Sequence, residues 1–268
     1  MKFLLSFFVI LGGIAFSFAD DFPQCTPVKL TEEEVINHYI GESQKQLWAL
    51  LNQPTIHQGI NVSIVELEKE KKTGVISSKL NNSGTANRVI LNGGLVSYSD
   101  FNWSHGSFAA WNFQNKVVSH EEKNINRWIE DSKTLGRLLG APTRDNFDFV
   151  VEAIRDGVGA LLGYRISMNL KNNALDKTLK NYVDFLARSK EVVVDPCAHE
   201  LRAKIKTFDT STAGIVKVQN MVMEIEYQYL NGIEYVRSQR VWTHLSVFGS
   251  GSDWQLDETF SKPEYDRQ

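Results

Sequence analysis

The sequence predicts an α+β protein in which helices pack on curved antiparallel sheets. Three observations support this fold class. From Ile215 to Phe260, apolar and polar residues alternate in three runs, and Asn231-Gly232 separates the first two; alternation interrupted by Asn-Gly is typical of a β-hairpin. Thr31 begins a capping box, which indicates a helix start. From Phe147 to Leu162, apolar residues recur at the spacing of an amphipathic helix.

Residues 1–19 are predicted to be a signal peptide. Lys2 supplies the positive end, Phe3–Phe18 is almost wholly apolar, and Ser17-Phe18-Ala19 matches a small-x-small cleavage site. The apolar run is shorter than the roughly 20 residues that a membrane-spanning helix needs. We therefore expect a secreted, extracellular protein with no membrane span after the signal is removed.

Composition narrows the classes of partner and suggests covalent modification. The net charge is -3, and no basic stripe suited to nucleic acid is present, so a nucleic-acid partner is not expected. Two cysteines, Cys25 and Cys197, predict one disulfide bond in an oxidising compartment. Asn61, Asn81 and Asn102 each begin an Asn-x-Ser sequon, which predicts a glycoprotein if the protein is made in a eukaryote.

The N-terminal region, 20–140, is predicted to be α+β. Its helix runs from Thr31 to about Asn52, with a break or kink at Gly41. The strands are expected to follow, with Asn92-Gly93-Gly94 as a second hairpin turn. The predicted strands are Ile60–Leu67, Gly74–Leu80, Arg88–Leu91, Leu95–Phe101 and Phe108–Val118.

The C-terminal domain, 141–268, is predicted to begin after the break at Gly140 and Pro142. A helix over Glu121–Leu139 is expected to end the N-terminal region. Helices are then expected over Asp145–Leu162 and Ala174–Lys190, and strands over Val192–Val194 and Leu201–Phe208, before the three-strand meander. Three glycines, Gly157, Gly159 and Gly163, lack the spacing and context of a dinucleotide-binding loop. We expect them to permit close packing of a neighbouring segment instead.

Pairing the meander strands suggests where polar side chains meet. About the Asn231-Gly232 turn, Glu226 would face Arg237. A four-residue loop before the third strand would place His244 opposite Asp257. A histidine held by a carboxylate is a candidate general base, because the carboxylate fixes its tautomer. The apolar face also changes sides between 240 and 244, which predicts a bend or bulge there.

The sequence favours a non-enzymatic binding or interaction protein, with a small apolar ligand or an extracellular protein as partner. The predicted ligand pocket lies at the crossover and contains Tyr227, Arg240, Trp242 and His244. No sequence motif for a metal or a cofactor is found, so neither is expected.

Two alternatives remain open. The first is a pocket enzyme of isomerase, dehydratase or hydrolase type that uses His244 and Asp257 as its catalytic pair. The second is a secreted toxin-like effector, because Ser211-Thr212 and Glu224-Ile-Glu226 resemble elements of secreted ADP-ribosyltransferases.

The order of elements after residue 145 resembles the nuclear transport factor 2-like fold, as found in small secreted nematode proteins. The resemblance covers about 145–260 and depends on helices between Asn146 and Lys190 followed by a curved meander that ends at Trp254-Gln255-Leu256. It implies a sheet wrapped around helices to form a cone-shaped pocket. Some members of that superfamily are isomerases or dehydratases, and many are noncatalytic binding proteins.

Overall fold

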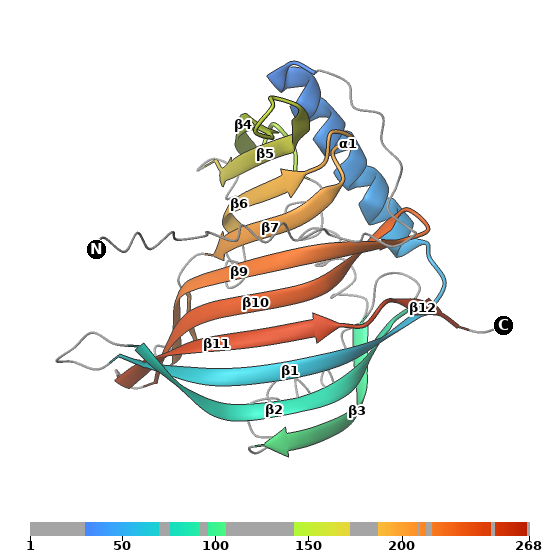
Figure 1. Cartoon of the computed structure of the whole chain (residues 1–268). Coiled ribbons are helices and arrows are strands. Elements are labelled where there is room, and N and C mark those ends of the chain that lie inside the picture. The colour runs from blue at the N-terminus through green and yellow to red at the C-terminus, as the bar shows by residue number, and fades with distance from the viewer. Residues whose placement is uncertain are drawn as a thin grey trace, which may run out of the picture.

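The described residues form one helix and a single twelve-stranded sheet, in which every strand pair is antiparallel (Figure 1). The computed structural model describes residues 30–69, 76–91, 96–105, 142–171, 187–207, 210–212, 216–247 and 250–266. The elements are α1 (Glu32–Leu51), β1 (Ile56–Lys69), β2 (Ile76–Ile90), β3 (Val96–His105), β4 (Phe147–Arg155), β5 (Leu161–Leu170), β6 (Ala187–Val194), β7 (Glu200–Thr207), β8 (Thr210–Thr212), β9 (Val216–Leu230), β10 (Ile233–Val247), β11 (Ser250–Phe260) and β12 (Glu264–Tyr265).

The strand order is β3-β2-β1-β11-β10-β9-β7-β6-β5-β4, with β12 paired to β1 and β8 to β9. Strand β1 therefore joins the first part of the chain to β11 near its end, and both predicted regions contribute to one sheet. Helix α1 crosses one face of the sheet, from β4 to the turn between β9 and β10 (Figure 1). The largest buried cluster lies between α1 and strands β4–β7 and β9.

The predicted helix at Thr31 is confirmed. The Thr31 hydroxyl accepts a hydrogen bond from the N–H of Glu34 at 3.3 Å, and the Glu34 carboxylate accepts one from the N–H of Thr31 at 2.8 Å. These reciprocal bonds satisfy backbone donors at the helix start. The expected break at Gly41 is absent, because α1 continues through it to Leu51.

We predict that Thr31→Ala lowers the free energy of unfolding by about 1 kcal/mol, since it removes the cap acceptor. Urea unfolding followed by circular dichroism would measure the change. Thr31→Ser keeps the hydroxyl and should stay close to the wild type. Equal stability of the alanine and serine variants would contradict the role of the cap.

The predicted α+β class, with helices packed on the sheet, is wrong. The predicted helix Asp145–Leu162 is instead the hairpin β4–β5, in which Phe147, Phe149 and Val151 alternate toward the core. Its turn is fixed by Asp156, whose carboxylate accepts N–H bonds from Val158 and Ala160 at 3.0 and 2.8 Å. A chain with one described helix and a large open sheet does not have the nuclear transport factor 2-like fold.

Other predicted helices and strands agree with the structure in part. Residues 76–80 and 88–90, from the predicted strands Gly74–Leu80 and Arg88–Leu91, belong to one strand, β2, and residues 96–101 of the predicted strand Leu95–Phe101 lie in β3. The end of the predicted helix Ala174–Lys190 is strand, since 187–190 belong to β6, which continues through the predicted strand Val192–Val194. The predictions at 92–94, 108–118, 121–139 and 174–186 lie outside the described residues.

The three-strand meander is confirmed as β9, β10 and β11. Asn231 and Gly232 both have positive φ, at 51° and 77°, as a two-residue hairpin turn requires. The predicted register holds only near this turn, because the β9–β10 pairing shifts between Val236 and Ser238 and again between Trp242 and His244. The second shift lies where the sequence predicted a bend or bulge.

Candidate functional site

One face of helix α1 changes from apolar to polar along its length. Val35 and Tyr39 belong to the main core, with exposed fractions of 1% and 0%. One and two turns further, the same face presents Glu42, Ser43 and Gln46, of which the first two are buried. Buried polar side chains require polar partners. The second half of α1 therefore covers a polar region of the sheet.

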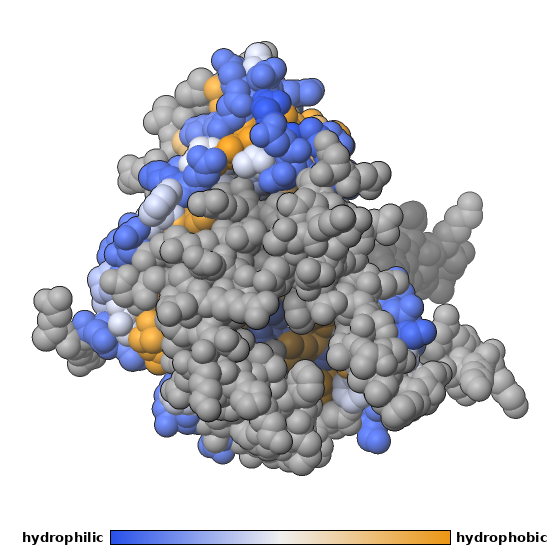
Figure 2. Space-filling view, turned by 180° about the vertical axis from the view of Figure 1, so that it is seen from behind, coloured by the Kyte–Doolittle hydropathy of each residue, from blue (hydrophilic) through white to orange (hydrophobic). Residues whose placement is uncertain are grey.

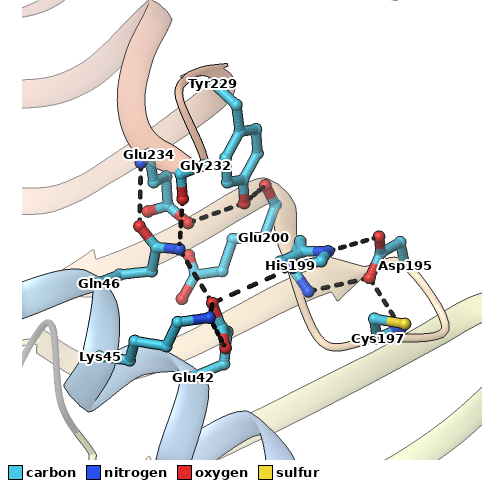
Figure 3. A network of polar contacts seen from close by, with 10 residues as sticks. All are labelled: Glu42, Lys45, Gln46, Asp195, Cys197, His199, Glu200, Tyr229, Gly232 and Glu234. Atoms are coloured by element: carbon cyan, nitrogen blue, oxygen red, sulfur yellow. Dashed lines mark hydrogen bonds and ion pairs between the residues drawn. The ribbon is translucent and has the colours of Figure 1, made fainter. Parts of the chain in front are cut away.

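The strands beneath this half of the helix supply the facing charges. Lys190 lies on the inner face of β6 with Val192 and Val194. A register shift between β6 and β7 places Glu200 on the same side as Ile205, although their numbers differ by an odd count. From β10, Glu234 points to the same place (Figure 3).

The turn between β6 and β7 is held rigidly by one carboxylate. Asp195 accepts hydrogen bonds from the backbone N–H groups of Cys197 and His199, at 2.8 and 2.9 Å. Its other oxygen lies 2.8 Å from the Nδ1 atom of His199. These contacts fix the backbone at the start of β7, which is where Glu200 begins.

Glu200 is the centre of the buried polar network. Its Oε1 atom accepts hydrogen bonds from the Tyr39 hydroxyl at 2.6 Å and from Lys190 Nζ at 2.7 Å. The Lys190 and Glu200 side chains are each 7% exposed. The Oε2 atom of Glu200 is buried and has no hydrogen-bond partner among the described residues. A buried carboxylate oxygen without a donor is unfavourable, and it marks a place for a missing partner.

Gln46 connects the helix to the β9–β10 hairpin. Its amide donates to Glu42 Oε1 and to the Gly232 carbonyl, both at 2.9 Å, and its oxygen accepts the N–H of Glu234 at 3.0 Å (Figure 3). The Glu234 carboxyl in turn lies 3.1 Å from the Tyr229 hydroxyl. The helix is therefore fixed over the sheet by hydrogen bonds at this end and by apolar packing at the other.

A cavity of about 240 Å³ remains between α1 and the strands. Its polar lining comes from both layers, and its apolar lining comes from side chains next to the main core. The lining residues are Glu42, Ser43, Gln46, Leu47, Lys190, Ala198, Glu200, Ile205, Tyr227 and Glu234. Because all of them lie on paired strands, on the helix or, for Ala198, in the β6–β7 turn that Asp195 holds, the cavity is a preformed feature of the fold.

Burial changes the acidity of several groups around this cavity. Burial, and then the nearby Glu200 carboxylate, raise the pKa of Glu234 well above its ordinary value. The same two causes raise the pKa values of Tyr39 and Tyr227. Removal from water disfavours the charged form of an acid. The tyrosines are therefore hydroxyl donors, and Glu234 tends to hold its proton.

The raised pKa of Glu234 predicts a specific pH dependence. The folded protein keeps a proton that the unfolded chain releases at the ordinary value of 4.5. This contribution to stability is complete below that pH and is lost as pH rises through the raised pKa. Relative to Glu234→Gln, which cannot titrate, the wild type should lose about 1.4 kcal/mol per pH unit in this window. Urea unfolding of both proteins from pH 4 to 8 measures the difference, and a constant difference would contradict the prediction.

The structure separates the residues predicted to form a catalytic pair. His244 Nδ1 lies 2.7 Å from Asp253, whereas Asp257 accepts a hydrogen bond from Arg240. The expected four-residue loop before β11 is wrong, since Val247 pairs with Ser250. The candidates His244 and Asp257 consequently do not face each other.

The predicted pocket residues are also divided. Tyr227 lines the cavity, but Arg240, Trp242 and His244 do not. The Arg240 guanidinium lies over the Trp242 ring, 5.6 Å from its centroid, and the Trp242 indole donates to Gln255 at 3.0 Å. Arg240 is an exposed residue and forms an ion pair with Asp257.

Two other predicted features concern covalent modification. Cys197 lies in the β6–β7 turn, but Cys25 is outside the described residues, so their disulfide bond stays a prediction. Of the sequon asparagines, Asn61 and Asn102 are exposed, and Asn81 lies in β2. Glycan attachment is likewise still a prediction.

The residues of the effector hypothesis lie in paired strands. Glu224 forms an ion pair with Lys204 at 2.8 Å, and Glu226 forms one with Arg202 at 3.5 Å. The predicted facing of Glu226 and Arg237 is wrong, because Glu226 lies opposite Ser238. Neither glutamate lines the cavity under α1.

Sequence reasoning missed Glu42, Lys190, Glu200 and Glu234. One signal was available for Glu42, since it continues the buried stripe of Val35 and Tyr39 along the helix. Glu200 had no such signal, because strict alternation from Ile205 would place it on the outer face. Only the register shift in the β6–β7 pairing reverses that assignment.

Within the described ranges, no group of three or more acidic, histidine or cysteine side chains is arranged to hold a metal ion. Figure 2 shows hydrophilic side chains gathered over the helix end of the molecule, with smaller hydrophobic areas between them. Val150, Val158 and Leu162 are exposed near β4 and β5; isolated exposed apolar residues are common in soluble domains.

No protein-family model matches the chain, and no curated protein matches it in sequence. Among solved structures, the chain is similar to an outer membrane lipoprotein-sorting protein domain from Vibrio parahaemolyticus, with 8% identity, a TM-score of 0.31, and coverage of 85% of this chain and 92% of that chain. It is also similar to MucB in the MucA/MucB complex of Pseudomonas aeruginosa, with 8% identity, a TM-score of 0.21, and coverage of 85% and 99%. At these TM-scores the likeness carries no argument about fold or function. The one helix described, α1, is not apolar enough to cross a membrane.

Proposed function

We propose that this protein is a secreted, non-enzymatic binding protein whose ligand occupies the cavity beneath α1. One observation carries the proposal: Glu200 Oε2 is buried beside the cavity and lacks a donor among the described residues. An unpaired buried acceptor costs about 1–3 kcal/mol. A ligand that donates a hydrogen bond to this oxygen would remove that cost and gain the apolar contact of Leu47 and Ile205.

Binding explains the arrangement better than catalysis does. His199 is the nearest histidine, but Asp195 holds its Nδ1 atom, and its Nε2 atom lies 4.0 Å from Glu42. His199 is not among the residues that line the cavity. A general base has to reach the proton that it removes. The residues that do line the cavity are those of a recognition site, with convergent polar groups and an apolar wall.

Export is a second part of the proposal, and it depends on the signal-like residues 1–19 and on the cysteine pair. The mature protein should contain a bond between Cys25 and Cys197. Intact mass spectrometry after alkylation, with and without reductant, checks this bond. Two thiols that react with the alkylating agent before reduction would argue against it.

The ligand proposal is tested by native mass spectrometry of the protein purified from culture medium. We expect a bound small molecule in the wild type and its loss in Leu47→Trp, because the larger ring fills the cavity. Gln44→Trp is the matched control, since it adds the same ring at an exposed position of α1. The proposal would be contradicted if the wild type carried no bound small molecule, or if Leu47→Trp retained the same molecule to the same extent.

A further inference from the structure

More acidic than basic side chains line the cavity beneath α1. Three carboxyl groups, from Glu42, Glu200 and Glu234, face one ammonium group, from Lys190. The next nearest cation of the helix, Lys45, extends into solvent with 72% of its side chain exposed and pairs with Glu42. We infer that the ligand of this cavity is a small organic ammonium ion with a short apolar body. This inference rests on the proposed binding function.

The orientation of Glu200 supports a cationic donor. Tyr39 and Lys190 both donate to its Oε1 atom, the Tyr227 hydroxyl lies close to the same carboxyl, and the Oε2 atom has no donor in good geometry among the described residues. The hydroxyl of Ser43, a residue with 7% exposure, lines the same cavity next to Tyr39. An ammonium group has three N–H donors and can satisfy acceptors of both kinds.

An anionic ligand does not suit the same surface. It would place a carboxylate or phosphate against the unpaired oxygen of Glu200, in a region of low dielectric where like charges repel strongly. The Lys190 ammonium does not offset this repulsion, because it is already 2.7 Å from Glu200 Oε1. A neutral alcohol could donate one hydrogen bond but would gain no charge-assisted contact.

The Glu234 carboxyl can act as a second counter-ion, next to Glu200, when a cation is bound. Burial favours its protonated form in the empty cavity. A bound ammonium would stabilise the charged form instead, so binding should release a proton. The titratable groups that face this site from the packed elements are Tyr39, Glu42 and Lys45 of α1, Lys190 of β6, His199 of the β6–β7 turn, Glu200 of β7, and Tyr227 and Tyr229 of β9.

The size of the cavity limits the ligand. A volume of about 240 Å³ is below the range of about 300–1,000 Å³ that is usual for drug-sized ligands. The apolar part of the lining consists of Leu47, Ala198, Ile205 and the Tyr227 ring. A chain of a few carbon atoms attached to the ammonium group fits both observations.

Isothermal titration calorimetry with three probes of matched length tests the inference: n-butylammonium, 1-butanol and butyrate. We expect n-butylammonium to bind at least about tenfold more tightly than 1-butanol, as a charge-assisted hydrogen bond implies, and butyrate not to bind. Repeating the titration in buffers of different ionisation enthalpy should show proton release near neutral pH.

Two variants and a control locate the effect. Glu234→Gln mimics the protonated carboxyl, so it should fold normally and lose both proton release and about tenfold in n-butylammonium affinity. Glu200→Gln should also weaken binding. Glu224→Gln removes a carboxylate from the exposed pair with Lys204 and should bind like the wild type.

The outcomes separate the inference from the proposed function. Tighter binding of butyrate or 1-butanol, abolished by Leu47→Trp, would overturn the ammonium assignment but leave a binding cavity. A second outcome is that n-butylammonium binds a folded Glu234→Gln protein as tightly as the wild type, and that the wild type releases no proton. This outcome would overturn the role of Glu234 and the inference with it. If none of the three probes binds, the inference is overturned. If the native mass spectrum of the wild type also shows no bound small molecule, the proposed binding function is overturned as well.

Discussion

Lys190→Met is expected to lower the free energy of unfolding by about 3–5 kcal/mol, because it leaves the Glu200 carboxylate buried without its cation. The two side chains are each 7% exposed and lie 2.7 Å apart. Methionine keeps most of the apolar stem of lysine, so little of the loss comes from packing. The remaining donor to Glu200, the Tyr39 hydroxyl, is neutral and cannot replace the lost charge.

Lys204→Met provides the matched control for this prediction. Lys204 and Glu224 also pair between neighbouring strands, β7 and β9, at 2.8 Å, but their side chains are 46% and 44% exposed. Exposed pairs contribute about 0–1 kcal/mol, since water screens both charges. Urea unfolding of the two variants measures the contrast. Equal losses would mean that the Lys190–Glu200 pair is solvated.

The double variant Lys190→Met/Glu200→Leu tests whether the Lys190–Glu200 ion pair is needed for stability. Replacing a whole buried ion pair with apolar residues is often neutral or stabilising. The double variant should therefore be more stable than Lys190→Met alone. Such a recovery would show that Glu200 is retained for recognition and not for stability.

The elements that the sequence predicted well are those with local signals. Thr31 and Glu34 are three residues apart, and their reciprocal bonds start α1 without help from the rest of the fold. Asn231 and Gly232 accept positive φ, so they define the β9–β10 turn by themselves. Both features depend on residues close in the chain, and both are confirmed.

The hairpin β4–β5 was mistaken for a helix because its pattern is ambiguous. Phe147, Val150, Val151 and Ile154 fit a helical repeat, yet Phe147, Phe149 and Val151 fit a strand equally well. The choice depends on long-range pairing, since β5 gains a second neighbour in β6. Tertiary pairing of this kind is not visible in a local window.

The candidate site could not be predicted for a related reason. Its charged residues come from α1, β6, β7 and β10, which are distant in the chain, and its formation requires the register shift at the start of β7. One shifted residue reverses the face of every side chain beyond it. Asp257 faces Arg240 and not His244 for another reason, because the loop before β11 is shorter than the predicted four residues.

Gly163→Ala is expected to lower the free energy of unfolding by roughly 3 kcal/mol or more, from steric overlap and backbone strain together. Gly163 directly precedes Tyr164, where the pairing of β5 with β6 begins, and its φ is +154°. A β-carbon there would lie far inside van der Waals contact with the carbonyl oxygen of Val194. The neighbour is backbone in a buried strand, so it cannot rotate away as a flexible side chain would.

Gly157→Ala is the control, because a β-carbon at that position meets nothing within 4 Å and the residue lacks a positive φ. Alanine restricts the conformations of the unfolded chain at this position. The free energy of unfolding should therefore stay unchanged or rise by about 0.4–1 kcal/mol. Urea unfolding compares the two variants, and similar stabilities would contradict the close β5–β6 approach. Val194 directly precedes Asp195, whose turn positions Glu200. Movement of Val194 in Gly163→Ala should therefore also weaken ligand binding in the cavity, whereas Gly157→Ala should retain it.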